Sequence, residues 1–303
     1  MAALLLVGVG HPLASEAKEQ PIPVVATLST FADLMKTIGG ARVNVSTIAP
    51  ATFNPHFIEP KPSDVLKVKR AALLIHAGLD LELWRGPLLD AAGNTKLFPG
   101  QPGELDLSQG IALLEVPDHV VSRIEGDIHI YGNPHYWLNP ENAKPMAQAI
   151  YDKLCALDPA SEQDYHRNLQ QFLAQLDQKI SAWKAKLAPY HGRELVGYHN
   201  EWPYLMHFAG LRMGRFLEPK PGIPPTPKQV QFIEGYLRDQ RIPAIVQATY
   251  FPRQTSDAVA KDTGAAVVLL CQNVKELPAC SDYLSMLEYN VTQLVRVLEK
   301  GAS

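Results

Sequence analysis

Residues 162–188, EQDYHRNLQQFLAQLDQKISAWKAKLA, form the clearest periodic stretch of the chain. Apolar side chains recur there at steps of three and four, which predicts an amphipathic helix of roughly 40 Å. Such a helix divides the chain into an N-terminal and a C-terminal part. A coiled-coil dimer is the alternative use of this stripe, but about four heptads without a clean flanking charge pattern disfavour it. The apolar positions are Tyr165, Leu169, Phe172, Leu173, Leu176, Ile180, Trp183 and Leu187.

The chain before this helix alternates short apolar runs with helical patterns. Ser29 and Thr30 precede one helical pattern and are expected to cap it, and Gly39-Gly40 is expected to end it. A loop-rich stretch, 92–134, follows, and Asn139-Pro140 then predicts the start of another helix. The predicted strands are 22–27, 43–48 and 71–75, and the predicted helices are 29–38, 62–70, 78–84 and 139–157.

The second part repeats this order, which predicts an α/β fold with two similar lobes, each a mostly parallel sheet flanked by helices, joined by one long helix. The tetrapeptide Glu-Pro-Lys-Pro occurs at 59–62 and again at 218–221, in agreement with two similar lobes. The predicted strands are 194–198, 211–216, 244–247 and 265–270, and the helices are 226–239, 256–263 and 283–299. The expected boundaries are 22–157 for the N-terminal lobe, 158–189 for the linking helix and 190–303 for the C-terminal lobe.

The composition excludes some partners. A formal net charge of -3 over 303 residues, with Lys and Arg scattered, gives no footprint for nucleic acid. Residues 1–17 are apolar and end in small side chains, so we expect a signal peptide there; the alternative is the N-terminus of a cytosolic protein. No other run approaches about 18 apolar residues, so the mature chain is expected to have no membrane span.

Three cysteines are present, at 155, 271 and 280. None follows the expected signal directly, which favours a soluble exported protein over one with a lipid-anchored cysteine there. Cys271 and Cys280 are close enough in sequence for a disulfide in an oxidising compartment, and two free thiols are the alternative. Cys155 is expected to be a buried thiol.

Three of the ten histidines stand in similar settings. His56, His135 and His199 each follow a strand or loop and precede a helix or turn, at the edge where α/β sheets place ligands. Neutral imidazole is the commonest metal ligand, and three of them suit zinc with a fourth position open. Their separations in sequence fix no geometry, so structural roles remain the alternative. His129, in a loop before His135, is a weaker candidate.

The chain resembles the metal-binding substrate-binding proteins of ABC importers, which take up zinc, manganese or iron(II), over essentially residues 22–300. The first-ligand loop of that family is similar to the segment around His56, the second-ligand motif to that around His135, and the third to that around His199. The segments that carry the resemblance are Pro55–Asp64, Gly78–Trp84, Pro134–Pro140, Tyr198–Tyr204 and the proline-rich turn Glu218–Pro227.

The resemblance implies that a metal ion is held in the cleft between the lobes. Gln272 stands where the family usually has an aspartate ligand, and an amide oxygen is a poorer zinc ligand than a carboxylate. The fourth ligand is therefore Gln272, water, Cys271 or Glu201. The long histidine-rich loop of many zinc members is absent or rudimentary, because 112–133 contains only His119 and His129.

Three histidines without an evident acidic partner favour zinc over Mn²⁺ or Fe²⁺. The expected function is periplasmic capture of zinc and its delivery to an ABC transporter permease by a monomer, with a metallochaperone as a further candidate partner. The alternative is a zinc hydrolase that uses the open position, with Glu201 as general base. No local enzyme motif supports it. A structural or adhesin-like role, with metal only for stability, is a third alternative.

Overall fold

The computed structural model describes residues 20–118, 129–220 and 222–301, so the expected signal at 1–17 lies outside it. Two four-stranded sheets have the orders β2-β1-β3-β4 and β6-β5-β7-β8, and every pairing within them is parallel. The shared order confirms the predicted pair of similar α/β lobes. The strands are β1 (Ile22–Ala26), β2 (Val43–Thr47), β3 (Leu73–His76), β4 (Glu104–Asp106), β5 (Glu194–Gly197), β6 (Arg212–Phe216), β7 (Ala244–Ala248) and β8 (Ala266–Leu270).

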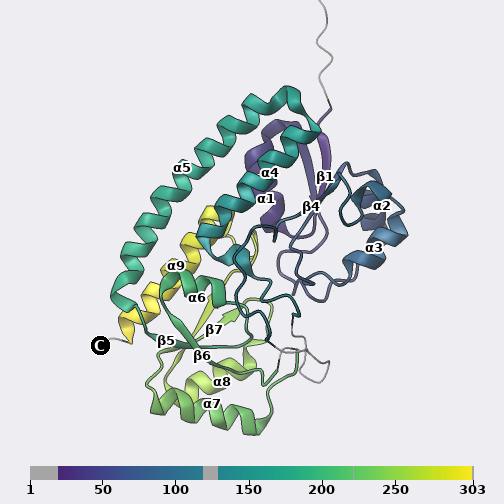
Figure 1. The fold of residues 1–303 in the computed structure, drawn as a ribbon. Helices are drawn as coiled ribbons and strands as arrows, with labels where there is room; N and C mark the ends of the chain where they lie inside the picture. The colour runs from purple at the N-terminus through teal and green to yellow at the C-terminus, as the bar shows by residue number, and fades with distance from the viewer. Residues whose placement is uncertain (1–19, 119–128, 221, 302–303) are drawn as a thin grey trace, which may run out of the picture.

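Helices cover both faces of each sheet (Figure 1). In the N-terminal lobe, α1 and α4 lie on the side of α5, and α2 and α3 lie on the opposite side. In the C-terminal lobe, α7 and α8 form the outer layer, and α6 and α9 lie towards α5. The helices are α1 (Ser29–Gly39), α2 (Pro62–Arg70), α3 (Arg85–Ala92), α4 (Ala143–Leu157), α5 (Glu162–Leu187), α6 (Pro203–Ala209), α7 (Pro227–Asp239), α8 (Arg253–Thr263) and α9 (Tyr283–Lys300).

The long helix predicted from the periodic stretch is α5, which has 26 residues and runs along both lobes (Figure 1). Its apolar side chains are buried within the chain, where α5 packs against α1, α4 and α9. The stripe is therefore used inside the molecule and not as a coiled-coil seam. The exact boundaries of the lobes and of the linking segment remain a prediction.

The start of α1 differs from the prediction. Ser29 and Thr30 do not cap the helix; its N-cap is Leu28, which makes no side-chain capping bond. The Ser29 hydroxyl instead donates to the Val274 carbonyl at 2.7 Å, and the Val274 amide donates to the Thr30 hydroxyl at 3.1 Å. Both hydroxyls therefore join the two lobes, because α1 belongs to one and Val274 to the other.

Residues 78–84 form a turn rather than the predicted helix, and α3 begins only at Arg85. Three consecutive residues, Gly78, Leu79 and Asp80, have positive φ angles of 68°, 51° and 54°. A side chain at Gly78 would meet the Asp106 carboxylate, so glycine is required there. Left-handed backbone at Leu79 and Asp80 is unusual for residues with a Cβ and must be held by its surroundings.

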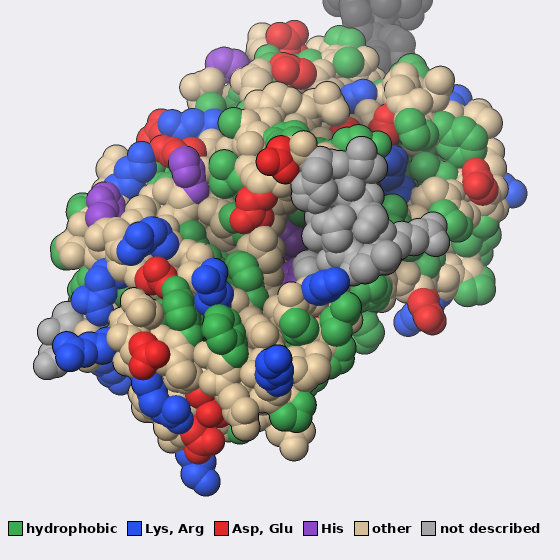
Figure 2. Space-filling view, turned by 60° about the horizontal axis from the view of Figure 1, so that its bottom comes forward, with side chains coloured by type: hydrophobic (Ala, Val, Ile, Leu, Met, Phe, Trp, Pro, Cys, Tyr) green, Lys and Arg blue, Asp and Glu red, His purple; other side chains and the backbone are tan. Residues whose placement is uncertain are grey.

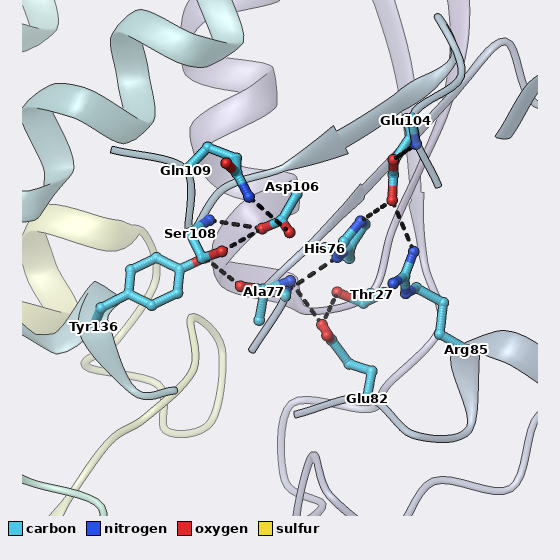
Figure 3. A network of polar contacts seen from close by, with 12 residues as sticks. Thr27, His76, Ala77, Glu82, Arg85, Glu104, Asp106, Ser108, Gln109 and Tyr136 are labelled. Atoms are coloured by element: carbon cyan, nitrogen blue, oxygen red, sulfur yellow. Dashed lines mark hydrogen bonds and ion pairs between the residues drawn. The ribbon is translucent and has the colours of Figure 1, made fainter. Parts of the chain in front are cut away.

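A buried polar network holds this turn (Figure 3). The Glu82 carboxylate accepts from the Thr27 hydroxyl at 2.6 Å and from the Ala77 amide at 2.9 Å. The Ala77 carbonyl accepts from the Tyr136 hydroxyl at 2.8 Å. Tyr136 directly follows His135, so the network fixes the turn and the loop of His135 relative to each other.

Hydrogen bonds between the lobes also pass through the second-ligand loop. The Trp137 indole donates to the Gln272 carbonyl at 2.8 Å, and the Tyr283 hydroxyl donates to the Trp137 carbonyl at 2.6 Å. All three residues are buried. These contacts limit independent movement of the lobes, in agreement with a single long helix as their connection. Over the described residues, no helix combines the length and apolar character that crossing a bilayer requires.

Candidate metal centre

The three predicted histidines come from loops that follow strands or precede helices. His56 lies between β2 and α2, His135 lies just before α4, and His199 follows β5 by two residues. Parallel strands place the loops at their carboxyl ends along one edge, which brings these segments into the space between the sheets. Figure 2 shows histidine side chains in a recess of the face turned forward, where Lys and Arg are interspersed with Asp and Glu.

His56 and His135 lie closest together. Their Nε2 atoms are 3.4 Å apart and their ring centres 5.3 Å apart. Two imidazoles that share a tetrahedral zinc ion, with bonds of about 2.0–2.1 Å, place their nitrogens about 3.4 Å and their ring centres roughly 5 Å apart. The pair therefore already has the spacing of two ligands of one ion.

The His199 ring completes the predicted triad from the C-terminal lobe. Its centre lies 6.0 Å from that of His56 and 6.3 Å from that of His135. Both separations exceed the ligand spacing by about 1 Å. As the side chains lie, the described residues contain no set of three His, Cys, Asp or Glu groups arranged to hold an ion, so closure around a metal needs a small movement of His199.

His129, the weaker candidate from the sequence, belongs to the same cluster. Its ring centre lies 4.9 Å from that of His56 and 6.4 Å from that of His135. Its Nε2 atom is buried and has no hydrogen-bond partner among the described residues. The only sequence signal for this residue is its place in the loop shortly before His135.

The rings of His129, His135 and His199 each have an oxygen atom close to Nδ1 that orients them. His199 Nδ1 lies 2.7 Å from the Glu218 carboxylate, His129 Nδ1 lies 2.8 Å from the Asp80 carboxylate, and His135 Nδ1 lies 3.2 Å from the Asn133 amide oxygen. An oxygen acceptor at Nδ1 keeps the proton there and leaves the lone pair on Nε2, the tautomer that binds metal.

Electrostatics favours neutral imidazoles at the centre of the cluster. The pKa of His56 is lowered well below its ordinary value. The largest cause is burial away from water, and repulsion from the nearby His129, His135 and His199 rings adds to it. Burial and the neighbouring His129 and His199 lower the pKa of His135 in the same way. A neutral ring is the form that ligates a metal, so the donor set fits a divalent ion.

Gln272, the predicted fourth ligand, is fully buried beside Glu201. Its Nε2 atom donates to Glu201 Oε2 at 2.6 Å, while its Oε1 atom is buried and has no hydrogen-bond partner among the residues that the structure describes. The Glu201 carboxylate also accepts from the Ala248 amide at 3.0 Å and from the Tyr250 hydroxyl at 2.8 Å. Both Glu201 oxygens are engaged, which argues against its use as a general base.

Cys271, another predicted alternative, faces Cys280. The two sulfur atoms are 2.6 Å apart and both residues are buried, with both cysteines present as thiols in the structure. Cys155 is half-buried instead of buried as expected. His76 Nε2 lies 2.9 Å from the Glu104 carboxylate, and His119 lies outside the described residues.

Two parallel-sheet lobes joined by a long helix, with imidazoles gathered between them, define a class: the metal-binding substrate-binding proteins of ABC transporters. The chain belongs to the family described as zinc-uptake complex component A, periplasmic, which matches residues 24–297. It is therefore a binding protein and not an enzyme.

Named relatives agree with this class. The manganese ABC transporter substrate-binding lipoprotein PsaA of Streptococcus pneumoniae serotype 4 is 26% identical, over 99% of this chain and 96% of the relative. A metal ABC transporter substrate-binding lipoprotein of Lactococcus lactis is 27% identical, over 99% and 95%. A crystal structure of ZnuA superposes with a TM-score of 0.78 at 25% identity, covering 92% of this chain and 99% of that one.

Proposed function

We propose that this protein captures zinc in the cleft between its lobes, with His56, His135 and His199 as ligands, and delivers it to an ABC transporter permease. The observation that carries the proposal is the 3.4 Å separation of the His56 and His135 Nε2 atoms, which matches two corners of a tetrahedral zinc site. His199, from the other lobe, makes the site depend on both lobes.

The donor set supports zinc over manganese. The gathered donors are imidazole nitrogens, whereas the carboxylates of Glu218 and Asp80 bind the far side of the His199 and His129 rings. Mn²⁺ prefers oxygen ligands, and imidazole suits Zn²⁺. Relatives are named both for manganese and for zinc uptake, so the preference rests on this chain's own ligands.

The cellular setting is part of the proposal. We expect the chain to act as a monomer in the periplasm after removal of residues 1–17, with the permease as its partner and a metallochaperone as a further candidate. The names of the relatives as ABC transporter components support the permease. The engaged carboxylate of Glu201 and the family membership speak against the zinc hydrolase.

The test is competitive titration of the metal-free protein with zinc and manganese, each with a chelator of known affinity. We expect one zinc per chain and a much weaker response to manganese. Loss of a group that hydrogen-bonds to a ligand already lowers metal affinity by about 10–100-fold, so loss of a ligand itself in His56→Ala, His135→Ala or His199→Ala should lower zinc affinity by at least about a hundredfold. His191→Ala, at an exposed histidine, is the matched control.

Unchanged zinc affinity in all three variants would show that these histidines do not form the zinc site. Tighter binding of manganese than of zinc would leave a metal-binding protein but reject zinc as its cargo. Hydrolysis of ester or phosphate probes that depends on bound zinc and on Glu201 would support the enzyme instead.

A further inference from the structure

His129 has the features of a metal ligand without having been assigned as one. Its ring is 4.9 Å from that of His56, closer than either His135 or His199. Its side chain is only 12% exposed, and its buried Nε2 atom has no hydrogen-bond partner among the described residues. A buried nitrogen lone pair without a donor is costly unless another group, such as a metal ion, uses it.

The protein holds the His129 ring by the same means as the predicted ligands. Asp80 binds His129 Nδ1 at 2.8 Å, as Glu218 binds His199 Nδ1 at 2.7 Å. A carboxylate behind an imidazole fixes the ring and its tautomer and is typical of metal sites. Asp80 reaches this position from left-handed backbone, next to Leu79 in the same conformation. Unusual backbone of this kind often occurs at functional sites, where the surroundings hold it.

Gln272 also has a buried atom without a partner among the described residues, its Oε1 atom, but it is less suited to the fourth position. Its Nε2 atom is bound to Glu201, its backbone amide donates to Glu276 at 2.8 Å, and its carbonyl accepts from Trp137 at 2.8 Å. A residue fixed at three points has little freedom to approach an ion between the histidines. Its neutral amide oxygen is also a weaker donor to zinc than imidazole.

We infer that His129, oriented by Asp80, is the fourth protein ligand of the captured zinc, in place of the residue at position 272. This inference rests on the proposed function and specifies its site. The N-terminal lobe then contributes His56, His129 and His135, and the C-terminal lobe contributes His199 alone. The ligands are then four neutral imidazoles. Each lobe also places one carboxylate behind a ligand, Asp80 behind His129 and Glu218 behind His199, and these two groups offset part of the positive charge of the ion.

This arrangement has two consequences. A site of four imidazoles contains no hard oxygen ligand, so it discriminates against Mn²⁺ more strongly than a site with a carboxylate. Three ligands from one lobe also mean that zinc can bind to the N-terminal lobe first, after which His199 completes the site.

The test is zinc K-edge X-ray absorption, which counts imidazole ligands directly, on the protein loaded with one zinc per chain. We expect four imidazoles in the wild-type protein and three imidazoles plus an oxygen in His129→Ala. Zinc affinity in His129→Ala should fall at least about tenfold, as expected from losses at metal sites. His129→Asp should restore zinc affinity in part and raise manganese affinity, because it supplies a carboxylate.

Further variants separate a ligand from a structural role. Asp80→Asn should keep four imidazoles but lower zinc affinity by about tenfold, because the ring is less firmly oriented. Gln272→Leu should keep the four-imidazole spectrum, and His166→Ala, next to Tyr151 and far in sequence from the site, is the matched histidine control.

Three imidazoles in the wild-type protein, unchanged in His129→Ala, would overturn the inference. Loss of an oxygen ligand in Gln272→Leu would give the fourth position to Gln272. Failure of the proposed function gives a different result, since the wild-type protein would then show no zinc bound to imidazole, or zinc binding would survive His135→Ala.

Discussion

The two lobes share one strand order but use the carboxyl edges of their sheets differently. In the N-terminal lobe, the buried carboxylate of Glu82 binds groups of its own lobe, Thr27 and Ala77, and the edge carries the loops of the histidine cluster. In the C-terminal lobe, Glu201 binds Gln272, which is itself bound to Trp137 of the other lobe. The comparison shows that the same strand order can serve two purposes. In the N-terminal lobe the buried carboxylate supports loops that carry histidines, and in the C-terminal lobe it supports a residue that joins the lobes.

Carboxyl groups near the two sheets also differ in the direction of their pKa shifts. Burial raises the pKa of Glu201 well above its usual value, and burial raises that of Glu276 as well. Burial acts in the same direction on Glu104 of the N-terminal lobe. There, however, hydrogen bonds from His76 and the Gly100 amide and the charge of Arg85 outweigh it and lower the pKa to about 2. Around Glu104 the charged form of the carboxylate is therefore favoured, and around Glu201 and Glu276 burial disfavours it.

The largest expected effect comes from removal of the Glu201 carboxylate in the C-terminal lobe. Glu201→Ala leaves three buried donors without an acceptor, and at about 1–3 kcal/mol for each group it should lower the free energy of unfolding by at least about 3 kcal/mol. Glu82→Ala leaves two such donors and should cost less, starting from about 2 kcal/mol. Urea unfolding measures both. Glu201→Gln, which keeps an acceptor, is the control, and a larger loss in Glu82→Ala would contradict the comparison.

The second effect tests a crosslink in the C-terminal lobe. Cys271 and Cys280 face each other, so we expect a disulfide in protein prepared under oxidising conditions, and thiol labelling should then find only Cys155 until reductant is added. Reduction should lower the free energy of unfolding by about 2–3 kcal/mol for a loop of this size. Cys155→Ser serves as the control. Labelling of three thiols in the oxidised protein under denaturing conditions would show that the pair stays reduced.

The third effect is a dependence on pH in the N-terminal lobe. The pKa of Glu104 in the folded state, about 2, lies below its usual value of 4.5, so its stabilisation is complete above about pH 4.5 and disappears as the pH falls towards 2. With a discount for solvent screening, we expect a loss of about 2 kcal/mol over that range.

The variant Glu104→Gln isolates the contribution of the Glu104 charge to the pH dependence of stability. Urea unfolding at pH 6, 4.5 and 3 should show a shallower loss of stability in the variant than in the wild-type protein. Equal slopes for the two proteins would mean that Glu104 is not held in its charged form by His76 and Arg85.

The smallest effect compares two threonines at helix starts. The Thr226 hydroxyl accepts from the Gln229 amide and caps α7, so Thr226→Ala should cost about 1 kcal/mol and speed amide hydrogen exchange in the first turn of α7. Thr30, which does not cap α1, should not change exchange at the start of α1 when replaced by alanine. Faster exchange there would show that Thr30 is a cap after all.

Most of the fold could be predicted from the sequence because the spacing of apolar residues indicates most of its helices and strands. The long helix α5, seven of the eight described strands and most helix ends lie within a few residues of the prediction, whereas β4 lies in the stretch 92–134, where no strand was assigned. The turn at 78–84 was wrongly predicted as a helix, since its spacing of leucines imitates a helical face while Gly78, Leu79 and Asp80 take positive φ angles. Helix α6 was not predicted at all, because seven residues carry too little periodicity.

The site was readable in part. The loops of His56, His135 and His199 carry local motifs, and the structure gathers all three rings. His129 was only a weaker candidate in the sequence because its partner Asp80 lies 49 residues away, in a turn that the sequence had suggested was helical. The function of Ser29 and Thr30 was missed for a similar reason, since Val274 becomes their neighbour only on folding.

The sequence by itself determined two parallel α/β lobes, a long connecting helix and three histidines in ligand-like loops, because period, capping and loop motifs are local properties of the chain. Only the tertiary structure decided which groups surround the cluster. It brought in His129 behind Asp80 and bound the amide of Gln272 to Glu201. Hydrogen bonds between residues far apart in sequence select these partners, and their distances exist only once the lobes have packed.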